Sequence, residues 1–399
     1  MNSVNRRLVL AGIISLSILA AACGSSSKTA TTSAPTTLPA ATTPAATTPG
    51  AAATTPSAAT TAEAPTTTAG TAATVDFSKL TGNLVASGAT FPKSFYDQAI
   101  SDLKAIAPGL TVEYAGGGSG QGQTDLQDMT KDFVGSDGVV KAADLPKYKG
   151  GEFVYVPTVI APITLSYNLP SVDKLQLSPA TVSGIFQLTI TKWNDPAIAA
   201  DNPGVTLPDS DIVAVVRSDP SGTTENFTKF LNAAVGPDAG GDWKLGGAKD
   251  VTFPSGTQNG NGNSGVAQLI TSTEGSIGYV DLSDAKANNL KFASVKNKAG
   301  KYIEPTLDGT TAAAKGAKIN DNLTYFLGWA DGDAAYPIAA QTWILAYTKQ
   351  ADPAKAAAIR GFLTYLVTDA QKTAPTIDYA PLPADLQAKA LANIAKIGA

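Results

Sequence analysis

The clearest indication of the fold class is the stretch Arg217-Ser-Asp-Pro-Ser-Gly-Thr-Thr-Glu-Asn-Phe227, which joins a buried strand to an amphipathic helix. The apolar run 212–216 before it predicts the strand, and apolar side chains within 227–231 have the spacing of one helical face. Ser221-Gly222-Thr223 therefore falls at a helix N-terminus, where unpaired N–H groups and the positive end of the helix dipole favour an anion. Arg217 adds a planar, permanently charged fork that suits an oxyanion. A plainer interpretation stays open, in which the serine or the glycine simply caps a helix.

Strands and helices alternate through the rest of the folded region, residues 76–399. Apolar runs predict strands at 82–87, 110–114, 133–136, 276–280 and 343–347. Helical spacing predicts helices at 92–107, 124–130, 264–271, 351–367 and 384–397, and 178–200 is expected to be mainly helical. Residues 153–168 predict a β-rich run, broken by Pro157 and Pro162, that crosses between two lobes. The alternation favours parallel-type sheets with helices on both faces, and such sheets bind ligands at the carboxyl ends of their strands.

Four strand ends carry related anion-binding chemistry. Gly88-Ala-Thr-Phe-Pro92 offers a hydroxyl and a free N–H at a helix start, and a glycine-rich turn at 116–122 offers Ser119 among unhindered amides. Ser221-Gly222-Thr223 is the third such turn, and Ser136-Asp137 follows another strand. The polar segment 259–263 is expected to be a solvated turn, with a place beside the ligand as the alternative.

The N-terminus has the pattern of a secretory signal peptide over residues 1–22. Arg6 and Arg7 precede an apolar run from 8 to 22, which is short for a membrane-spanning helix. The run ends at Cys23, the only cysteine of the chain, directly after Leu-Ala-Ala-Ala. This arrangement resembles a lipoprotein signal, in which the cysteine is acylated and becomes the mature N-terminus, with palmitate as an expected acyl group. A soluble secreted protein with a stray cysteine is the alternative, and the paired arginines leave twin-arginine export open.

Residues 23–75 are expected to form a tether between this cysteine and the folded region. Thr, Ala and Pro dominate the segment, aromatic residues are absent, and Lys28 and Glu63 are its only charges. Such a composition buries too little apolar surface to offset the entropy of an ordered chain. The segment is therefore predicted to be disordered.

Composition excludes several classes of function. The net charge is −4 at pH 7, so no general basic field attracts nucleic acid, and any anion site must be local. The chain has no histidine, which excludes Ser-His-Asp and Cys-His catalysis and the usual zinc sites. Asp201, Asp209 and Asp211 lack the spacing of a calcium loop. We therefore expect no catalytic residue, no metal and no cofactor, and we expect Trp193 and Trp343 to be core residues.

At the strand ends described above, the chain resembles the phosphate-binding proteins of Pst ABC transporters. The matching stretches run in the order of that family and span residues 83–397. They are Gly88-Ala-Thr-Phe-Pro92, Tyr114-Ala-Gly-Gly-Gly-Ser-Gly120, Asp132-Phe-Val-Gly-Ser-Asp137, Val216-Arg-Ser-Asp-Pro-Ser-Gly-Thr223, Gly275-Ser-Ile-Gly-Tyr279, Tyr336-Pro-Ile338 and Asp378-Tyr-Ala-Pro-Leu-Pro383.

The resemblance implies a set of phosphate ligands. In the family these match Thr90, Phe91 through its N–H, Ser119, Asp137, Arg217, Ser221, Gly222 and Thr223. An acid that matches Asp219 orients the guanidinium. Pro220 stands where the family often has glycine, and Gly138 stands where alanine is common, but neither departure removes a ligand.

The resemblance also implies a fold and a role. The fold is α/β, a two-lobe periplasmic-binding-protein fold of type II, in which helices flank a mixed, mostly parallel sheet in each lobe. Lobe I is expected over 76–158 and 337–399, and lobe II over 159–336. The role is that of an extracytoplasmic receptor that delivers inorganic phosphate to an ABC permease. It is expected to be a monomer, not an enzyme, and anchored by Cys23 to the outer face of the cell membrane.

The chemistry of the residues agrees with a phosphate ligand. A phosphate dianion is costly to desolvate and needs many donors, which the hydroxyls and helix-start amides supply. Asp137 beside an anion makes sense only if the ligand carries a proton that the carboxylate accepts, as phosphate does and sulfate at neutral pH does not. Two other classes stay open: the same fold used for another oxyanion or as a surface adhesin or antigen, and a secreted phosphatase. The phosphatase is disfavoured, because the chain lacks a histidine, a metal cluster and an activated nucleophile.

Overall fold

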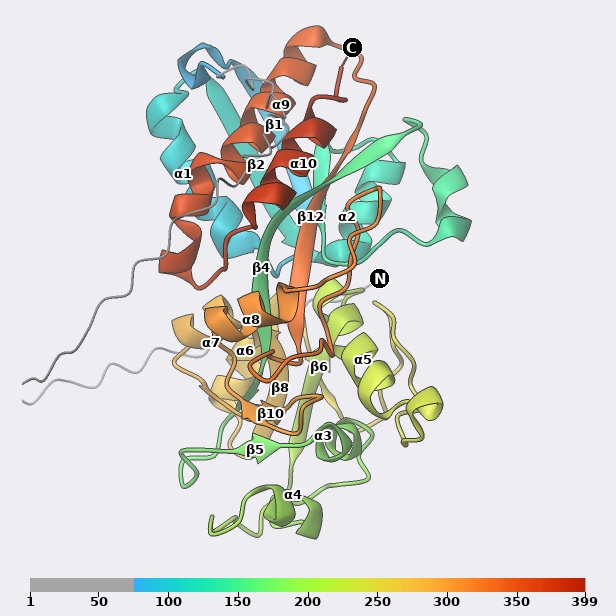
Figure 1. Ribbon diagram of the computed structural model, residues 1–399, viewed down its shortest axis with the longest axis vertical. Coiled ribbons are helices and arrows are strands. Elements are labelled where there is room, and N and C mark those ends of the chain that lie inside the picture. Colours follow the sequence, from blue (N-terminus) through green and yellow to red (C-terminus); the bar gives the residue numbers. More distant parts are fainter. Residues whose placement is uncertain (1–74, 399) are drawn as a thin grey trace, which may run out of the picture. The chain divides into compact units, whose positions relative to one another are not determined.

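The computed structural model describes residues 75–398, shown in Figure 1. The predicted signal peptide, Cys23 and nearly all of the predicted tether lie outside these residues. The strands are β1 Gly82–Gly88, β2 Leu110–Gly117, β3 Phe133–Ser136, β4 Phe153–Tyr167, β5 Gln176–Leu177, β6 Val213–Arg217, β7 Gln258–Gly260, β8 Ser276–Asp281, β9 Lys291–Phe292, β10 Ser294–Lys296, β11 Tyr302–Ile303 and β12 Ala339–Tyr347.

Ten α-helices lie among the described residues. They are α1 Lys93–Ile106, α2 Gly118–Gln127, α3 Pro179–Phe186, α4 Pro196–Asp201, α5 Gly222–Val235, α6 Gly262–Ser272, α7 Leu282–Ala287, α8 Leu307–Ala314, α9 Pro353–Val367 and α10 Ala384–Ile394. Short 3-10 helices lie at Phe77–Lys79, Ala142–Lys147, Pro237–Ala239, Asp369–Lys372 and Ala374–Ile377. None of the helices within 75–398 combines the length and the apolar character needed to span a bilayer.

Two sets of parallel strands are joined by long antiparallel strands, in the order β2-β1-β3-β12-β4-β8-β6-β7. β1 pairs in parallel with β2 and β3, and we call the part of the chain built around these strands lobe I. β6 pairs in parallel with β7 and β8, and the part built around these is lobe II. β12 is antiparallel to both β3 and β4, and β4 is antiparallel to β8. Each sheet is therefore mixed. The strand ends that carry the predicted anion-binding residues belong to its parallel strands.

β4 belongs to both sheets. Residues 153–162 pair with β12, whereas residues 163–167 pair with β8. Pro157 and Pro162 do not interrupt the strand, contrary to the predicted breaks, although neither has an N–H to donate to the ladder. A register shift between Gln341 and Trp343 of β12 adjusts the pairing near Pro157. Figure 1 shows β4 and β12 running from one group of strands to the other.

Aromatic side chains fill the core of each lobe. In lobe I, Phe133 of β3 packs on Phe362 of α9, with ring centroids 5.4 Å apart. In lobe II, Phe227 of α5 stacks on Tyr279 of β8 at 4.4 Å. Such pairs stabilise a core beyond the apolar area that they bury. Trp193 and Trp343 are fully buried, so the prediction that they are core residues is confirmed.

Three segments differ from the sequence prediction. The predicted turn 116–122 is the end of β2 followed directly by the start of α2, because Gly117 and Gly118 make the bend with positive φ and the following residues are already helical. The predicted helical region 178–200 is two short helices, α3 and α4, separated by an extended segment that carries the buried Trp193. The predicted turn 259–263 contains the end of β7, which pairs with β6, and the start of α6. A three-residue strand of polar residues has no periodic pattern to detect.

Candidate functional site

The residues predicted to bind an anion come from four strand ends and both lobes. Thr90 and Phe91 lie between β1 and α1, Ser119 lies in the first turn of α2, and Asp137 follows β3 directly. In lobe II, Arg217 ends β6, Ser221 caps α5 by accepting from the Thr224 N–H at 3.2 Å, and Gly222 and Thr223 begin α5. All of these except Thr90 are more than nine-tenths buried. The carboxyl ends of parallel strands thus bring polar groups to one buried place, as the fold leads one to expect.

The guanidinium of Arg217 is held on two sides. Nε donates to Oδ1 of Asp219 at 2.8 Å, and Nη2 donates to Oδ2 of the same carboxylate. Nη1 donates to Oδ1 of Asn263 at 2.6 Å. Asp219 in turn accepts from the Gly262 N–H at 3.0 Å. The orientation of the fork is therefore set by a bidentate ion pair in which the side chain of Arg217 is 1% exposed and that of Asp219 is 8% exposed.

Asp137 is a buried carboxylate with one free oxygen. Asp137 is 2% exposed, and its Oδ1 has no hydrogen-bond partner among the described residues. Oδ2 accepts from Oγ of Ser119 at 3.4 Å, and the Asp137 N–H donates to the same hydroxyl at 3.0 Å. Burial raises the pKa of Asp137 to about 7, although the nearby hydroxyl of Thr342 and the positive charge of Arg217 oppose the shift. The group is thus poised to accept or release a proton near neutrality.

Glycines allow the two lobes to approach closely at this point. A Cβ atom at Gly222 would collide with Oγ of Ser119 and with the side chain of Asp137. A Cβ atom at Gly118 would collide with the carboxylate of Asp219. The Gly120 N–H donates to the carbonyl of Pro220 at 2.9 Å. The first turns of α2 and α5 therefore meet, which is a closed arrangement of the lobes around the site.

Asn263 was not named as a ligand, and the favoured prediction of a solvated turn at 259–263 is wrong at this position, where the alternative of a place in the site agrees better with its burial. Asn263 is fully buried, its Oδ1 accepts from Arg217, and its Nδ2 donates to Oδ1 of Asp281 at 2.6 Å. Its N–H donates to Oγ1 of Thr90 at 3.3 Å, across the lobes. Helix α6 begins at Gly262 with a positive φ, which turns Asn263 inward. The sequence feature that could have indicated a buried Asn263 is Gly262, a glycine between a strand and a helix, as at the other strand ends of the site.

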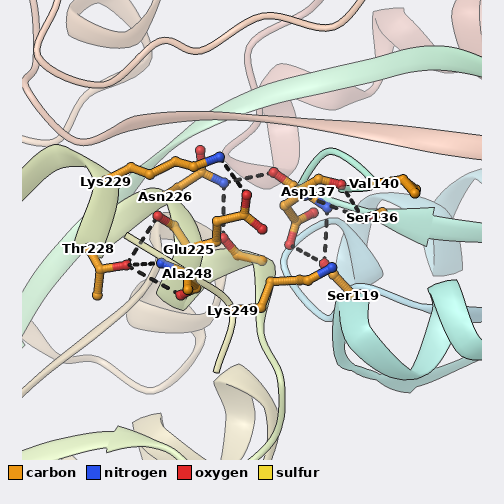
Figure 2. A network of polar contacts seen from close by, with 12 residues as sticks. Ser119, Ser136, Asp137, Val140, Glu225, Asn226, Thr228, Lys229, Ala248 and Lys249 are labelled. Carbon is orange, nitrogen blue, oxygen red and sulfur yellow. Dashed lines mark hydrogen bonds and ion pairs between the residues drawn. The ribbon is translucent and has the colours of Figure 1, made fainter. Parts of the chain in front are cut away.

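A network of amides surrounds Asp137, as Figure 2 shows for Asn226. Nδ2 of Asn226 donates to the carbonyls of Asp137 at 2.9 Å and Gly222 at 3.0 Å. Nε2 of Gln341, on β12, donates to Oδ1 of Asn226 at 2.9 Å. These contacts fix the turn after β3 relative to α5. No sequence signal pointed to Asn226 or Gln341, because polar residues on a buried helix or strand face do not follow hydrophobic periodicity.

Comparison with known proteins places the chain in a family. The family model described as the PBP superfamily domain matches residues 50–370. The phosphate-binding protein PstS of Haemophilus influenzae is 35% identical to this chain over 322 residues, which cover 79% of the chain and 93% of that protein. The chain belongs to the PstS family. The resemblance stated from the sequence is therefore confirmed.

A second relative and two solved structures support the family assignment and the fold. The phosphate-binding protein PstS of Methanocaldococcus jannaschii is 35% identical over 342 residues, covering 78% of this chain and 83% of that protein. The phosphate-binding protein of Stenotrophomonas maltophilia has a TM-score of 0.61 at 22% identity, covering 78% and 93% of the two chains. A high-affinity periplasmic phosphate-binding protein solved with phosphate has a TM-score of 0.64 at 21% identity, with the same coverage. These similarities confirm the predicted two-lobe α/β fold.

Proposed function

We propose that this chain is an extracytoplasmic receptor that binds inorganic phosphate and delivers it to an ABC permease. The observation that carries the proposal is the combination of a buried, oriented Arg217 fork with Asp137, a buried carboxylate that has one oxygen without a partner and whose pKa is raised by burial against the opposing charge of Arg217. A cation alone would suit any anion, whereas the carboxylate suits an anion that still carries a proton. The relatives are phosphate-binding proteins by name, which supports the same ligand here.

The proposed ligand set combines side-chain and backbone donors. Its members are Thr90, Phe91 through its N–H, Ser119, Asp137, Arg217, Ser221, Gly222 and Thr223. The starts of α2 and α5 contribute unpaired N–H groups and the positive ends of two helix dipoles. Nη1 of Arg217 and one N–H of Nη2 already donate to protein groups, so the remaining Nη2 hydrogen is the donor that this guanidinium can offer to a ligand. Asp219 acts by holding that donor in place.

We infer that the lobes close over the ligand as the working motion. The proposed lobe boundaries are 76–158 with 337–399 for lobe I, and 159–336 for lobe II. β4 passes from one lobe to the other within a single strand, so bending of β4 and its partner β12 is the proposed hinge. The role is transport and not catalysis, since the chain has no histidine and its relatives are binding proteins.

We infer further that the receptor is a monomer held at the outer face of the cell membrane by an acylated Cys23. The supporting observations are the apolar run before a lone cysteine and the Thr/Ala/Pro-rich composition of the following segment. The thiol and its flanking residues suit lipidation, and the segment suits a tether.

Calorimetric titration with phosphate, arsenate and sulfate, after removal of endogenous ligand, tests the proposed function. Arsenate also keeps a proton near neutral pH, so it should compete with phosphate, whereas a large excess of sulfate should not. A site built around one obligatory hydrogen bond rejects an analogue lacking that bond by about 10⁴–10⁵-fold. Asp137→Asn should relax this rejection, because the amide can donate to an unprotonated oxygen.

Two outcomes would contradict the proposal. Equal displacement of phosphate by sulfate and arsenate from the unmutated protein would remove Asp137 as the selectivity residue. Binding of sulfate but not of phosphate would support the alternative of a receptor for another oxyanion.

A further inference from the structure

Lys249 lies between the lobes, outside the proposed ligand set. The residue is 9% exposed, and its Nζ donates to Oε1 of Gln123 in α2 of lobe I. Its carbonyl oxygen accepts from the N–H of Ser221, the cap of α5, at 3.0 Å. Lys249 therefore contacts both helices whose first turns meet at the site, and Figure 2 shows it in the same network as Ser119 and Asp137.

Gln123, the hydrogen-bond partner of Lys249, contacts the turn that contains Asp137. Nε2 of Gln123 donates to Oγ of Ser136 at 3.0 Å and to the carbonyl of Gly138 at 3.0 Å. These two residues flank Asp137 in sequence. The ammonium is thus two hydrogen bonds away from the turn that carries the buried carboxylate.

This ammonium has no carboxylate of its own. Within residues 75–398, no carboxylate oxygen lies within 4.0 Å of Nζ of Lys249, since the ion pairs found there involve other groups. Glu225, whose charge most favours the ammonium, is paired with Lys229 at 2.5 Å. Burial lowers the pKa of Lys249, and the charges of Glu225, Asp144 and Asp250 oppose that shift from beyond ion-pair distance. A buried cation without a counter-ion is costly, so its counter-charge is to be sought in a ligand.

Among the described residues, the charged side chains of the proposed site include no other cation without a paired carboxylate. Arg217 and Asp219 cancel one another in their bidentate pair, and Asp137 adds a negative charge when it is ionised. Asp281, one hydrogen bond beyond Asn263, adds a further carboxylate. The four charged side chains named above are therefore negative in sum, and Lys249 adds a positive charge between the lobes.

We propose that Lys249 is a second cation of the site, which stabilises the bound anion through space once the lobes have closed. This inference rests on the proposed phosphate function. Because Gln123 and Ser221 belong to different lobes, Lys249 reaches its position only in the closed arrangement. Its charge should therefore slow ligand release more than it speeds ligand capture, as is usual for buried charges.

The test compares three variants of the full chain: Lys249→Met, Lys249→Arg and Lys244→Met. Lys244 lies in the same loop and is exposed, so it is the matched control. Lys249→Met should weaken phosphate binding by about 10- to 100-fold, the scale of one unit charge several ångströms away in a protein interior. Stopped-flow kinetics should assign most of this loss to faster dissociation. Arsenate affinity should fall by the same factor, because a charge acting through space does not distinguish the two anions.

Stability measurements separate this role from a structural one. Replacing a buried charge by an apolar side chain is often neutral or stabilising, so the Tm of ligand-free Lys249→Met should be unchanged or higher. Lys249→Arg should keep most of the affinity, since it keeps the charge. Unchanged phosphate affinity in Lys249→Met, an equal loss in Lys244→Met, or failure of Lys249→Met to fold would each overturn the inference. Absence of phosphate binding by the unmutated chain would instead overturn the proposed function.

Discussion

At the scale of single residues, the ion pair of Arg217 and Asp219 governs how the site meets an anion. The carboxylate of Asp219 accepts hydrogen bonds from Nε and Nη2, and Oδ1 of Asn263 accepts one from Nη1. The guanidinium therefore cannot rotate to follow a ligand. A fixed donor loses little entropy when a ligand arrives, which favours affinity and geometric selection. Asp219 and Asn263 therefore contribute to binding without needing to contact the anion.

Removal of Arg217 should cost far more binding free energy than removal of a neighbouring hydroxyl. Arg217→Ala removes a donor and leaves the carboxylate of Asp219 without its cation beside the anion, so it should weaken phosphate binding by about 2–5 kcal/mol. Thr223→Ala removes one buried hydroxyl and should cost about 1–3 kcal/mol. Calorimetry on both variants measures the difference. Equal small losses would show that the anion site lies elsewhere in the chain.

The buried Asp137 should make the ligand-free protein less stable as pH rises. Between its ordinary pKa of about 3.9 and its native pKa of about 7, the folded chain keeps a proton that the unfolded chain releases. The stability that this proton confers is complete below about pH 4 and is lost as pH rises through about 7. Asp137→Asn cannot lose this proton, so its ligand-free Tm should fall less between pH 4 and 8.

Exposed Asp242→Asn is the control for this pH effect, because its carboxylate is in solvent. It should follow the unmutated protein across the whole range. If Asp137→Asn also follows the unmutated protein, the carboxylate at 137 is not the group that titrates.

At the scale of elements, the meeting of α2 and α5 depends on glycine at the first position of α5. Gly222→Ala should weaken phosphate binding, because the added methyl group collides with Ser119 and Asp137 only when the lobes are closed. Overpacking of this kind costs about 1–3 kcal/mol. Small-angle X-ray scattering with saturating phosphate should show incomplete closure, while the ligand-free profile stays unchanged. Ser264→Ala is the control, because Ser264 is an exposed residue near the start of α6, and tight binding by Gly222→Ala would contradict this account of closure.

Elements with a clear period were predictable from the sequence, and the contacts between them were not. β3 has the predicted bounds, and α1 and α9 begin and end within two residues of the predictions, because apolar spacing records which face is buried. The buried Asn263 and the two-helix region 178–200 could not be found in this way. Asn263 is buried because it hydrogen-bonds to Arg217 and Asp281, and the burial of a polar residue cannot be recognised from the spacing of apolar residues. The strand ends that the structure groups around Arg217 were indicated by their own residues, and the resemblance to a family added the complete ligand set.

At the scale of the whole molecule, attachment and binding should be separable. Cys23→Ala should move the full chain from the membrane fraction to the soluble fraction, because acylation needs the thiol. Phosphate affinity should stay unchanged, since all proposed ligands lie between residues 90 and 223. Fractionation followed by titration checks both statements, with Ser25→Ala as a control that keeps the cysteine. A variant without Cys23 that remains fully in the membrane fraction would contradict the lipid anchor.

The sheet order also sets when the molecule becomes complete during its synthesis. β3, which carries Asp137 at its end, needs β12 as its neighbour, and β12 is made some two hundred residues later. An incomplete chain therefore exposes an unpaired edge of β3 until residues 339–347 are available to pair with it, and protease protection of residues 133–136 should appear only then. Ligand capture is accordingly the last property that a growing chain acquires. An incomplete polypeptide would be recognisable to quality control before it could withdraw any phosphate from its surroundings.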